Sequence, residues 1–562
     1  MFDLKSVSSL EKILPDRKCD TAECKCVSGL ENETVSFQLV FASDKRAAYS
    51  FDIAGDGLDV KVYFVENVPV EFPTFPLTLN DSDFISHLPG LYPDRLVPAD
   101  RNWVQVTDIY KALWVSVSGK CGVHKLNAVF RDENGETAAE CSLDVHIINA
   151  ELPKQDLIYT QWFHTDCISE FYGFETFSEE HWAMIEKFMR LARENGINMI
   201  LTPVFSPPLD TQVGRKRPVS QLLIIKKNGK SYSFDFNRVK RWINLCQAAG
   251  FEYYEMPHLF TQWGAEFTPR IIAEVDGEEK DIFGWNVYAV SEEYDNFLSQ
   301  LLPQLLDFLK SEGIFAKTYF HISDEPFLEH LENYGKARRI AEKYLEGCKI
   351  IDALSDYDFY RNGVVRIPIP STDHIKPFLD AELSERWCYY CCSQCVNVSN
   401  RFTVMPSSRN RSIGFQLYKY RMDGFLHWGF NFYYSQYSRI LLDPFAQTDA
   451  YDAFPSGDAI GAYPCRSGPA PSIGLVVFNE ALQDLRALKL LEKYIGYENT
   501  VSLAEKALGE EISFDSCYCA EAILKTRECI NNKIASETEK RYYRENCPAI
   551  PASGRGIGKS YA

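Results

Sequence analysis

The chain has 562 residues, of which 46% are hydrophobic and 24% are charged. This is the composition of a globular protein with a large core, and the length corresponds to about two to four domains. The net charge of −19 repels the phosphates of nucleic acids and anionic lipid headgroups. The composition therefore argues against nucleic acid as a partner and favours a neutral substrate.

Targeting and membrane signals are absent from the sequence itself. The first residues lack a basic start followed by an apolar stretch, and no run of about 18 apolar residues occurs, so we expect neither a secretory signal nor a membrane span. The chain has 17 cysteines, an odd number, and without a secretory signal we expect reduced thiols and a cytoplasmic location. No glycine-rich phosphate loop or other cofactor motif is found, and nothing indicates an oligomeric state.

Residues 1–152 have the pattern of a β-domain. β-Branched and aromatic runs cover 35–41, 60–65 and 141–148, and the turn sequence Asp-Glu-Asn-Gly at 132–135 lies between two strand-like runs. Helical periodicity is nearly absent. We predict an N-terminal antiparallel β-sandwich that ends at Leu152 and Pro153.

The following 300 residues alternate between short apolar strands and amphipathic helices. This alternation favours a parallel sheet, and eight repeats favour an α/β fold of the (β/α)8 TIM-barrel type over residues 155–497. An open, doubly wound sheet is the alternative, because strand order cannot be read from the sequence. A helical extension is expected at 498–562. The strands are expected at 159–164, 198–205, 251–258, 317–323, 349–354, 364–369, 386–391 and 424–430, and the main helices at 178–195, 237–249, 292–311, 327–346 and 478–494.

Polar and aromatic residues gather where the predicted strands end. Active sites of such barrels lie at the carboxyl ends of the strands, so these residues are the candidates for substrate binding; packing in the barrel is the alternative for each, and Tyr390 is the alternative to Tyr389. The candidates are His164, His258, His321, Trp387, Tyr389, His427, Trp428 and Asn431.

Two adjacent carboxylates form the sharpest motif. Asp324 and Glu325 follow an apolar strand in the sequence His-Ile-Ser-Asp-Glu-Pro. Neighbours on a regular strand point to opposite faces, so both can face the barrel mouth only where the strand ends. Their mutual repulsion raises one proton affinity, which suits a general acid. A plain helix start is the alternative reading of Ser-Asp-Glu-Pro.

Most glycosidases place their two carboxylates about 5–9 Å apart, on either side of the scissile bond. Adjacent carboxylates fit the substrate-assisted exception better, in which the acetamido oxygen of the sugar attacks the anomeric carbon. One carboxylate then orients the amide, and the other protonates the leaving oxygen.

These segments resemble glycoside hydrolase family 123, the β-N-acetylgalactosaminidases. The resemblance rests on 321–326, on Trp-Cys-Tyr-Tyr at 387–390, on Asp-Gly-Phe-Leu-His-Trp-Gly-Phe-Asn at 423–431, and on Ser-Gly-Asp at 456–458 with Tyr463-Pro464. It implies a β-sandwich followed by a barrel, with Asp324 orienting the acetamido group and Glu325 as general acid/base. It further implies a retaining exo-enzyme that removes terminal β-linked N-acetylgalactosamine from glycolipid or oligosaccharide chains, without metal or cofactor.

Two alternatives remain at this stage. A glycosidase of ordinary type would pair Glu325 with Glu255, and a barrel without catalysis would only bind carbohydrate. The latter is suggested by Gly474, which stands where similar sequences carry an arginine. The cysteines in Cys-Tyr-Tyr-Cys-Cys-Ser-Gln-Cys at 388–395 invite a metal site, but structural zinc usually needs a second paired cluster, and packed thiols are expected.

Overall fold

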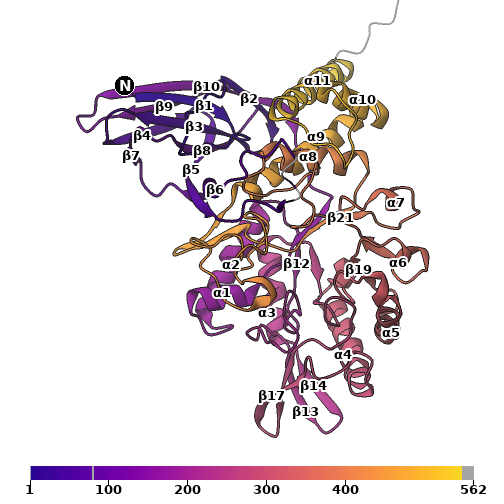
Figure 1. Cartoon of the computed structure of the whole chain (residues 1–562). Coiled ribbons are helices and arrows are strands. Elements are labelled where there is room, and N and C mark those ends of the chain that lie inside the picture. The colour runs from indigo at the N-terminus through magenta and orange to yellow at the C-terminus, as the bar shows by residue number, and fades with distance from the viewer. Residues whose placement is uncertain (1, 77, 79–80, 547–562) are drawn as a thin grey trace, which may run out of the picture.

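The computed structural model describes residues 2–76, 78 and 81–546, the last five by their backbone alone. The last part of the helical extension expected at 498–562 lies outside these residues. A β-sandwich lies beside the body that carries a parallel sheet, and the C-terminal helices pack against both (Figure 1). Within the described part of the chain, no helix combines the length and the apolar character needed to cross a bilayer.

The N-terminal part consists of two five-stranded sheets packed face to face, with orders β1-β3-β8-β5-β6 and β2-β10-β9-β4-β7. Alternate side chains of both sheets, such as Phe37, Val115 and Phe130, form a core of their own, as expected for a sandwich. The strands are β1 (Phe2–Ser8), β2 (Cys26–Glu31), β3 (Val35–Ser43), β4 (Ala47–Gly55), β5 (Leu58–Val70), β6 (Gly90–Pro98), β7 (Trp103–Val106), β8 (Lys111–Gly119), β9 (Gly122–Arg131) and β10 (Thr137–Glu151).

One pair of this sandwich departs from the predicted antiparallel arrangement. β2 lies parallel to β10, because the chain reaches β2 by a crossover from β1 in the other sheet rather than by a hairpin. The predicted turn at 132–135 is present between the antiparallel strands β9 and β10. Gly135 has φ +82° there, which is a conformation that glycine adopts without strain.

Eight parallel strands form a nearly closed sheet in the order β20-β19-β18-β15-β12-β11-β22-β21. Between β20 and β21 the sheet is joined by a single parallel bridge, in which the Tyr389 N–H donates to the Pro370 carbonyl at 3.0 Å. The strands are shorter than the predicted apolar runs: β11 (Ile158–Gln161), β12 (Met199–Leu201), β15 (Tyr253–Glu255), β18 (Thr318–Phe320), β19 (Lys349–Ala353), β20 (Ile367–Ile369), β21 (Trp387–Tyr389) and β22 (Gly424–His427).

Helices follow these strands, although two of the connections are single turns. The predicted helix at 327–346 begins as a 3-10 turn, η3 (Leu328–His330), before α5. The helices are α1 (Thr165–Tyr172), α2 (Glu179–Glu194), α3 (Asn237–Ala249), α4 (Glu292–Ser311), α5 (Leu331–Glu342), α6 (Asp358–Arg361), α7 (Lys376–Leu379), α8 (Ser407–Lys419), α9 (Ile473–Ile495), α10 (Tyr497–Leu508) and α11 (Ala520–Asn546).

Two insertions after β12 and β15 build a small additional sheet. Its order is β14-β13-β16-β17, and it projects at the end of the molecule opposite the sandwich (Figure 1). The sequence pattern did not predict these strands, because they lie in segments interpreted as loops. They are β13 (Ile224–Asn228), β14 (Ser231–Asp235), β16 (Ile271–Val275) and β17 (Glu278–Phe283), and a separate hairpin is formed by β23 (Ala462–Cys465) and β24 (Gly468–Pro471).

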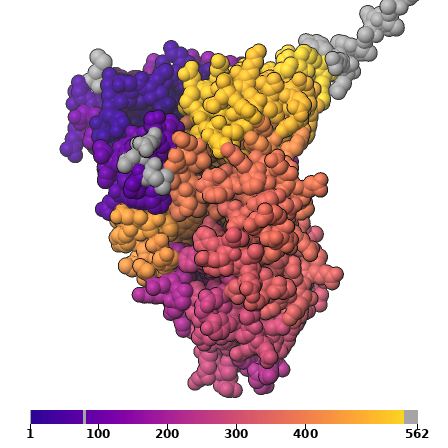
Figure 2. Space-filling model, turned by 45° about the vertical axis from the view of Figure 1, so that its right-hand side comes forward, coloured from indigo at the N-terminus to yellow at the C-terminus, as the bar shows by residue number. Residues whose placement is uncertain are grey.

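A buried ionic cluster joins the C-terminal helices to the rest. Arg527 on α11 contacts Glu33, next to β2, at 2.6 Å and Asp484 on α9 at 2.8 Å, and Arg411 on α8 contacts Asp484 at 2.7 Å. All four side chains are buried, so each charge depends on its partners. Figure 2 shows the resulting contact between the yellow C-terminal helices and the indigo sandwich.

Candidate active site

A cavity of about 170 Å³ opens at the carboxyl ends of the parallel strands. Apolar and aromatic walls surround a few polar groups, as in typical ligand sites. The lining residues are Trp162, His164, Leu209, Asp210, Gln262, Trp263, Asp324, Glu325, Ala353, Tyr389, Cys391, Cys392, Leu426, Trp428, Phe432, Gln436, Tyr437 and Phe454.

The adjacent carboxylates both line this cavity. β18 ends at Phe320, so Asp324 and Glu325 are free of the strand alternation that would separate them. Glu325 has φ +40°, in the left-handed region that L-residues other than glycine rarely adopt, and its N–H donates to the Ala353 carbonyl at 3.0 Å. Such backbone strain is often found at functional sites.

Burial perturbs the pKa of both acids, and charge repulsion adds to the effect on Asp324. Burial, followed by the charge of Glu325, raises the pKa of Asp324 well above its usual range, although the charge of His321 opposes the rise. Burial also raises the pKa of Glu325, against a hydrogen bond from the Tyr389 hydroxyl at 2.6 Å that favours the ionised form. Because two adjacent buried carboxyls do not ionise together easily, a proton on one of them favours the ionised form of the other.

Three of the eight predicted binding residues line the cavity with the two acids. Tyr389 donates to Glu325 as described, and the Trp428 indole donates to Asp458 at 3.0 Å, which fixes its ring. His164 contacts the Trp428 carbonyl at 3.2 Å. Burial and the nearby Arg217 lower the pKa of His164 to about 3, so it is a neutral polar group of the wall.

His321 and His258 lie one layer below the cavity. His321 Nε2 is 2.6 Å from Glu255, and Nδ1 is 3.4 Å from Asp352. Burial disfavours its charge, but these two acids raise the pKa of His321 to about 9. His258 stacks on it with ring centroids 4.3 Å apart. β18 ends one residue before His321 and β15 ends three residues before His258, and the side chains turn inward beside Trp162.

Glu255, the proposed partner of Glu325 in the alternative two-carboxylate mechanism, is fully buried in this lower layer. Its carboxylate accepts hydrogen bonds from Thr160 and from the Trp162 indole, both at 2.7 Å, in addition to the His321 contact. It does not line the cavity. A carboxylate committed to three protein groups is poorly placed to activate water.

Trp387, His427 and Asn431 do not line the cavity either. β21 begins at Trp387, so its ring lies at the opposite end of the barrel, against Tyr319. His427 is buried and contacts Arg401 at 3.0 Å. Asn431 is buried and bonds both backbone groups of His164 at 2.9 Å. His427 and Asn431 support the cavity wall from behind. The alternative Tyr390 donates to Asn410 and is also buried outside the cavity.

Among the described residues, one group of three, His258, His321 and Asp352, has spacing compatible with a metal ion. The rings of the two histidines are stacked with an interplanar angle of 27°, so their ring planes do not converge on one point. Asp352 already accepts from the Ile322 N–H at 2.9 Å. The trio therefore fits a hydrogen-bonded layer better than a metal centre. In the described part of the chain, the cysteines do not form a group of three ligands close enough to hold a metal ion.

Sequence reasoning missed much of one wall. Asp210 and Gln262 lie in loops after β12 and β15, and Tyr437 lies in the long loop after β22. Trp263, in the long segment after β15, is in the cavity wall, and its ring meets the Tyr437 ring edge-on at 5.6 Å. Trp285 from the same segment lies elsewhere, bonded to the Arg215 carbonyl. Irregular loops carry no periodic signal, so only composition could have suggested them.

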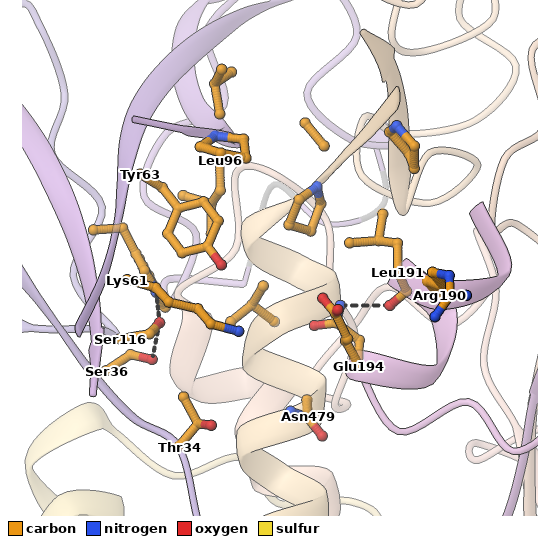
Figure 3. Close-up of a pocket in the computed structure, with 18 of the residues that line it drawn as sticks. Thr34, Ser36, Lys61, Tyr63, Leu96, Ser116, Arg190, Leu191, Glu194 and Asn479 are labelled. Carbon is orange, nitrogen blue, oxygen red and sulfur yellow. Dashed lines mark hydrogen bonds between the residues drawn. The ribbon is translucent and has the colours of Figure 1, made fainter. Parts of the chain in front are cut away.

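A second cavity of about 630 Å³ lies where the sandwich meets α2 and α9. Lys61, Tyr63 and Glu194 point into it from opposite sides (Figure 3). Lys61 and Glu194 are exposed, so water satisfies them. This cavity contains no buried pair of acids, and its position is away from the strand ends. We therefore assign the chemistry to the smaller cavity.

Gly474, where an arginine was expected from the resemblance, lies at the start of α9. A Cβ there would be 3.5 Å from Arg401. Arg401 is buried and bonds the carbonyls of Gly429 at 2.6 Å and Asp458 at 2.7 Å. Gly474 therefore lies beside the Cβ and backbone carbonyl of Arg401, whose guanidinium holds the loops that carry the cavity wall.

Comparison with known proteins agrees with this architecture. The family model described as glycoside hydrolase 123, catalytic domain, matches residues 162–491. A structure of a family 123 glycoside hydrolase from Clostridium perfringens, described for glycolipid glycan hydrolysis, is 14% identical with a TM-score of 0.70, covering 97% of this chain and 99% of that one. At this identity, the match shows a shared fold.

Other structural similarities are weak. A family 2 glycosyl hydrolase from Bacteroides cellulosilyticus has a TM-score of 0.26 at 10% identity, over 70% of this chain and 43% of that one. A β-glucuronidase from Parabacteroides merdae has a TM-score of 0.26 at 11% identity, over 76% and 47%. No curated protein matches the chain.

Proposed function

Since the chain belongs to glycoside hydrolase family 123, we propose that it is a retaining exo-enzyme that hydrolyses terminal β-linked N-acetylgalactosamine by substrate-assisted catalysis. Asp324 orients the acetamido group and Glu325 is the general acid/base. The observation that carries the proposal is the presence of two successive acidic residues in one small cavity.

This arrangement favours substrate assistance over the ordinary mechanism. Two successive residues cannot flank a glycosidic bond from opposite sides, as paired carboxylates at about 5–9 Å do. They can instead act side by side on the 2-acetamido group and on the leaving oxygen. Glu255, the other acid considered, is outside the cavity and fully hydrogen bonded.

In the first step, the acetamido oxygen attacks C1 and the bond from C1 to the leaving oxygen breaks. Glu325 gives its proton to that oxygen, and Asp324 accepts a hydrogen bond from the amide N–H, stabilising the positive charge of the oxazolinium ring. In the second step Glu325 takes a proton from water, whose oxygen attacks C1. The bond from C1 to the acetamido oxygen breaks, and the sugar leaves with its original anomeric configuration.

The coupling between the two acids suits this sequence. An amide N–H bound to Asp324 stabilises its ionised form, which leaves the proton on Glu325 for the leaving group. Tyr389, now bonded to Glu325, is within reach of the acetamido carbonyl once substrate displaces water. Exo-action agrees with the small volume of the cavity, which has room for one sugar.

The sugar and the aglycone rest on the resemblance. The Clostridium perfringens enzyme is described as acting on glycolipid glycans, and we propose glycolipids or oligosaccharides as substrates here. We also propose a division into a sandwich (1–152), a complete (β/α)8 TIM barrel (155–497) and a C-terminal extension (498–562). The closely packed ionic cluster of Arg527 argues that these parts fold together.

The test compares rates on aryl β-glycosides of N-acetylgalactosamine, N-acetylglucosamine and galactose, for the wild type, Glu325→Gln and Glu329→Gln. Glu329 has an exposed side chain four residues away, so Glu329→Gln controls for the substitution itself. We expect turnover of the first glycoside alone or most rapidly, a fall of about 10²–10⁴ in Glu325→Gln, and no change in the control.

Equal turnover of the galactoside would contradict the substrate-assisted mechanism, since that sugar has no acetamido group. If no glycoside is turned over, binding of a thiazoline that mimics the intermediate separates the remaining cases. Tight binding would indicate that a natural aglycone is required, whereas no binding would indicate a carbohydrate-binding protein without catalysis.

A further inference from the structure

Two polar side chains on one wall of the cavity are joined to each other. The Asp210 N–H, in the loop after β12, donates to Gln262 Oε1, in the loop after β15, at 2.5 Å. Both residues line the cavity. The direct bond fixes the amide of Gln262, so that its oxygen faces Asp210 and its Nε2 is directed elsewhere.

Gln262 Nε2 is a buried donor without a partner. The residue is only 5% exposed, and Nε2 has no hydrogen-bond acceptor within the described part of the chain. Buried amide donors are nearly always bonded in folded proteins. Because this one belongs to a cavity-lining side chain, a ligand hydroxyl in the cavity is a natural acceptor.

The carboxylate of Asp210 supplies the matching acceptor. Its Oδ2 accepts from the Tyr437 N–H at 2.9 Å, and its carbonyl accepts from the Ser438 hydroxyl at 2.6 Å. A carboxylate offers about four acceptor sites, so capacity remains toward the cavity. Asp210 and Tyr437 both have positive φ, of 39° and 60°, which shows that the two loops hold these residues in strained, defined positions.

The pair lies on a particular side of the catalytic acids. Glu325 is tied to Tyr389 on β21 and to the end of β19, whereas the Asp324 carbonyl accepts from the Trp263 N–H, next to Gln262, at 2.9 Å. Asp210 is close enough for its charge to act on Asp324. The order around the mouth is therefore Glu325, Asp324, then Asp210 with Gln262.

A sugar ring presents its groups in a corresponding order. If Glu325 acts at C1 and Asp324 at the C2 acetamido group, the next groups around the ring are the 3- and 4-hydroxyls. We propose that Asp210 and Gln262 bind these two hydroxyls, Asp210 as acceptor and Gln262 Nε2 as donor, and so select the configuration at C4. This inference rests on the proposed function for its orientation, and it names specificity residues that the sequence did not suggest.

The experiment pairs enzyme variants with deoxy substrates. kcat/KM is measured for the full chain on the aryl β-glycoside of N-acetylgalactosamine and on its 3-deoxy, 4-deoxy and 6-deoxy analogues. The enzymes are the wild type, Asp210→Ala, Gln262→Ala and Glu266→Ala. Glu266 is exposed on the same loop as Gln262 and serves as the matched control.

We expect the wild type to lose about 10- to 100-fold on the 3- or 4-deoxy substrate, as when a hydrogen bond to a charged or buried group is removed. Asp210→Ala and Gln262→Ala should lower kcat/KM on the parent glycoside by a similar factor. On that deoxy analogue, where the hydroxyl is already missing, each substitution should lower kcat/KM little further. The 6-deoxy analogue should show no such coupling. Glu266→Ala should behave as the wild type.

The proposal would be overturned if the loss of kcat/KM from each substitution and the loss from each missing hydroxyl multiplied independently for every analogue. Independent losses would mean that the side chain and the hydroxyl do not touch. A second overturning result is an Asp210→Asn variant whose only change is a shifted pH profile of kcat/KM. Asp210 would then act through its charge on Asp324 and not on the sugar.

A binding experiment distinguishes failure of the proposed catalytic function from failure of the proposed subsite. Binding of methyl β-N-acetylgalactosaminide and its deoxy analogues is followed by calorimetry, without any need for turnover. Affinity that depends jointly on Asp210 and on the 3- or 4-hydroxyl, in a protein that hydrolyses nothing, would refute the catalytic proposal and support this subsite. Affinity that is indifferent to Asp210, Gln262 and both hydroxyls would refute the subsite.

Discussion

Removal of the Tyr389 hydroxyl tests how the site sets the proton affinity of its general acid. The hydroxyl donates to Glu325 at 2.6 Å and favours the ionised carboxylate, so it holds the pKa of Glu325 below the value that burial alone would give. A hydrogen bond to a charged group contributes about 1.5–3 kcal/mol. Since about 1.4 kcal/mol corresponds to one pH unit, Tyr389→Phe should raise the pKa of Glu325 by about one to two.

The assay is the pH dependence of kcat/KM, whose basic limb reports loss of the proton from the general acid of the free enzyme. We expect this limb to move to higher pH by about one to two units in Tyr389→Phe. Tyr390→Phe is the matched control, because its hydroxyl donates to Asn410 at 2.8 Å and is buried outside the cavity. A basic limb that stays in place in Tyr389→Phe, or that moves equally in the control, would refute the reasoning.

Three further predictions concern stability. The raised pKa of His321, about 9, stabilises the wild type by roughly 3 kcal/mol below about pH 6.5, and this stabilisation is lost by about pH 9. His321→Gln should therefore reduce the fall in the free energy of unfolding between these two pH values, as denaturant titrations at each pH would reveal. Gly424→Ala places a Cβ about 2.2 Å from the Trp387 ring and should cost at least about 1–3 kcal/mol, whereas Gly335→Ala, in a helix with a flexible neighbour, should cost nothing; thermal melts distinguish them. Arg527→Met leaves the buried Glu33 carboxylate without its cation and removes one of the two arginines bound to Asp484, so it should cost about 3–5 kcal/mol; an unchanged melting temperature would contradict this.

Regular elements could be predicted closely where capping signals bound them. α3 ends at Ala249, directly before Gly250 with φ +93°, and α4 begins after Ser291, whose hydroxyl accepts the Tyr294 N–H. These signals act within one turn, so sequence alone carries them. The parallel edge strand β2 could not be predicted, because pairing direction depends on the path of the chain between sheets.

The expectation that active-site residues follow the carboxyl ends of the strands identified residues of the cavity, but it did not separate them from residues buried beneath it. Asp324, Glu325, Tyr389, Trp428 and His164 all line the cavity, because the chain leaves the sheet at those points. This expectation cannot tell whether a side chain near a strand end points up into the mouth or down into the layer beneath. The residues of the opposite wall lie on long loops with left-handed backbone, where neither periodicity nor propensity gives a signal.

The lower layer nevertheless bears on the chemistry. His321, held between Glu255 and Asp352, is charged at neutral pH, and its charge favours the ionised form of Asp324. In the proposed mechanism, an ionised Asp324 keeps the proton on Glu325, which donates it to the leaving group. A histidine predicted to touch the sugar thus acts through the acid above it. Its replacement by glutamine should accordingly move the acid limb of kcat/KM to higher pH, whereas a direct sugar contact would weaken binding at every pH alike.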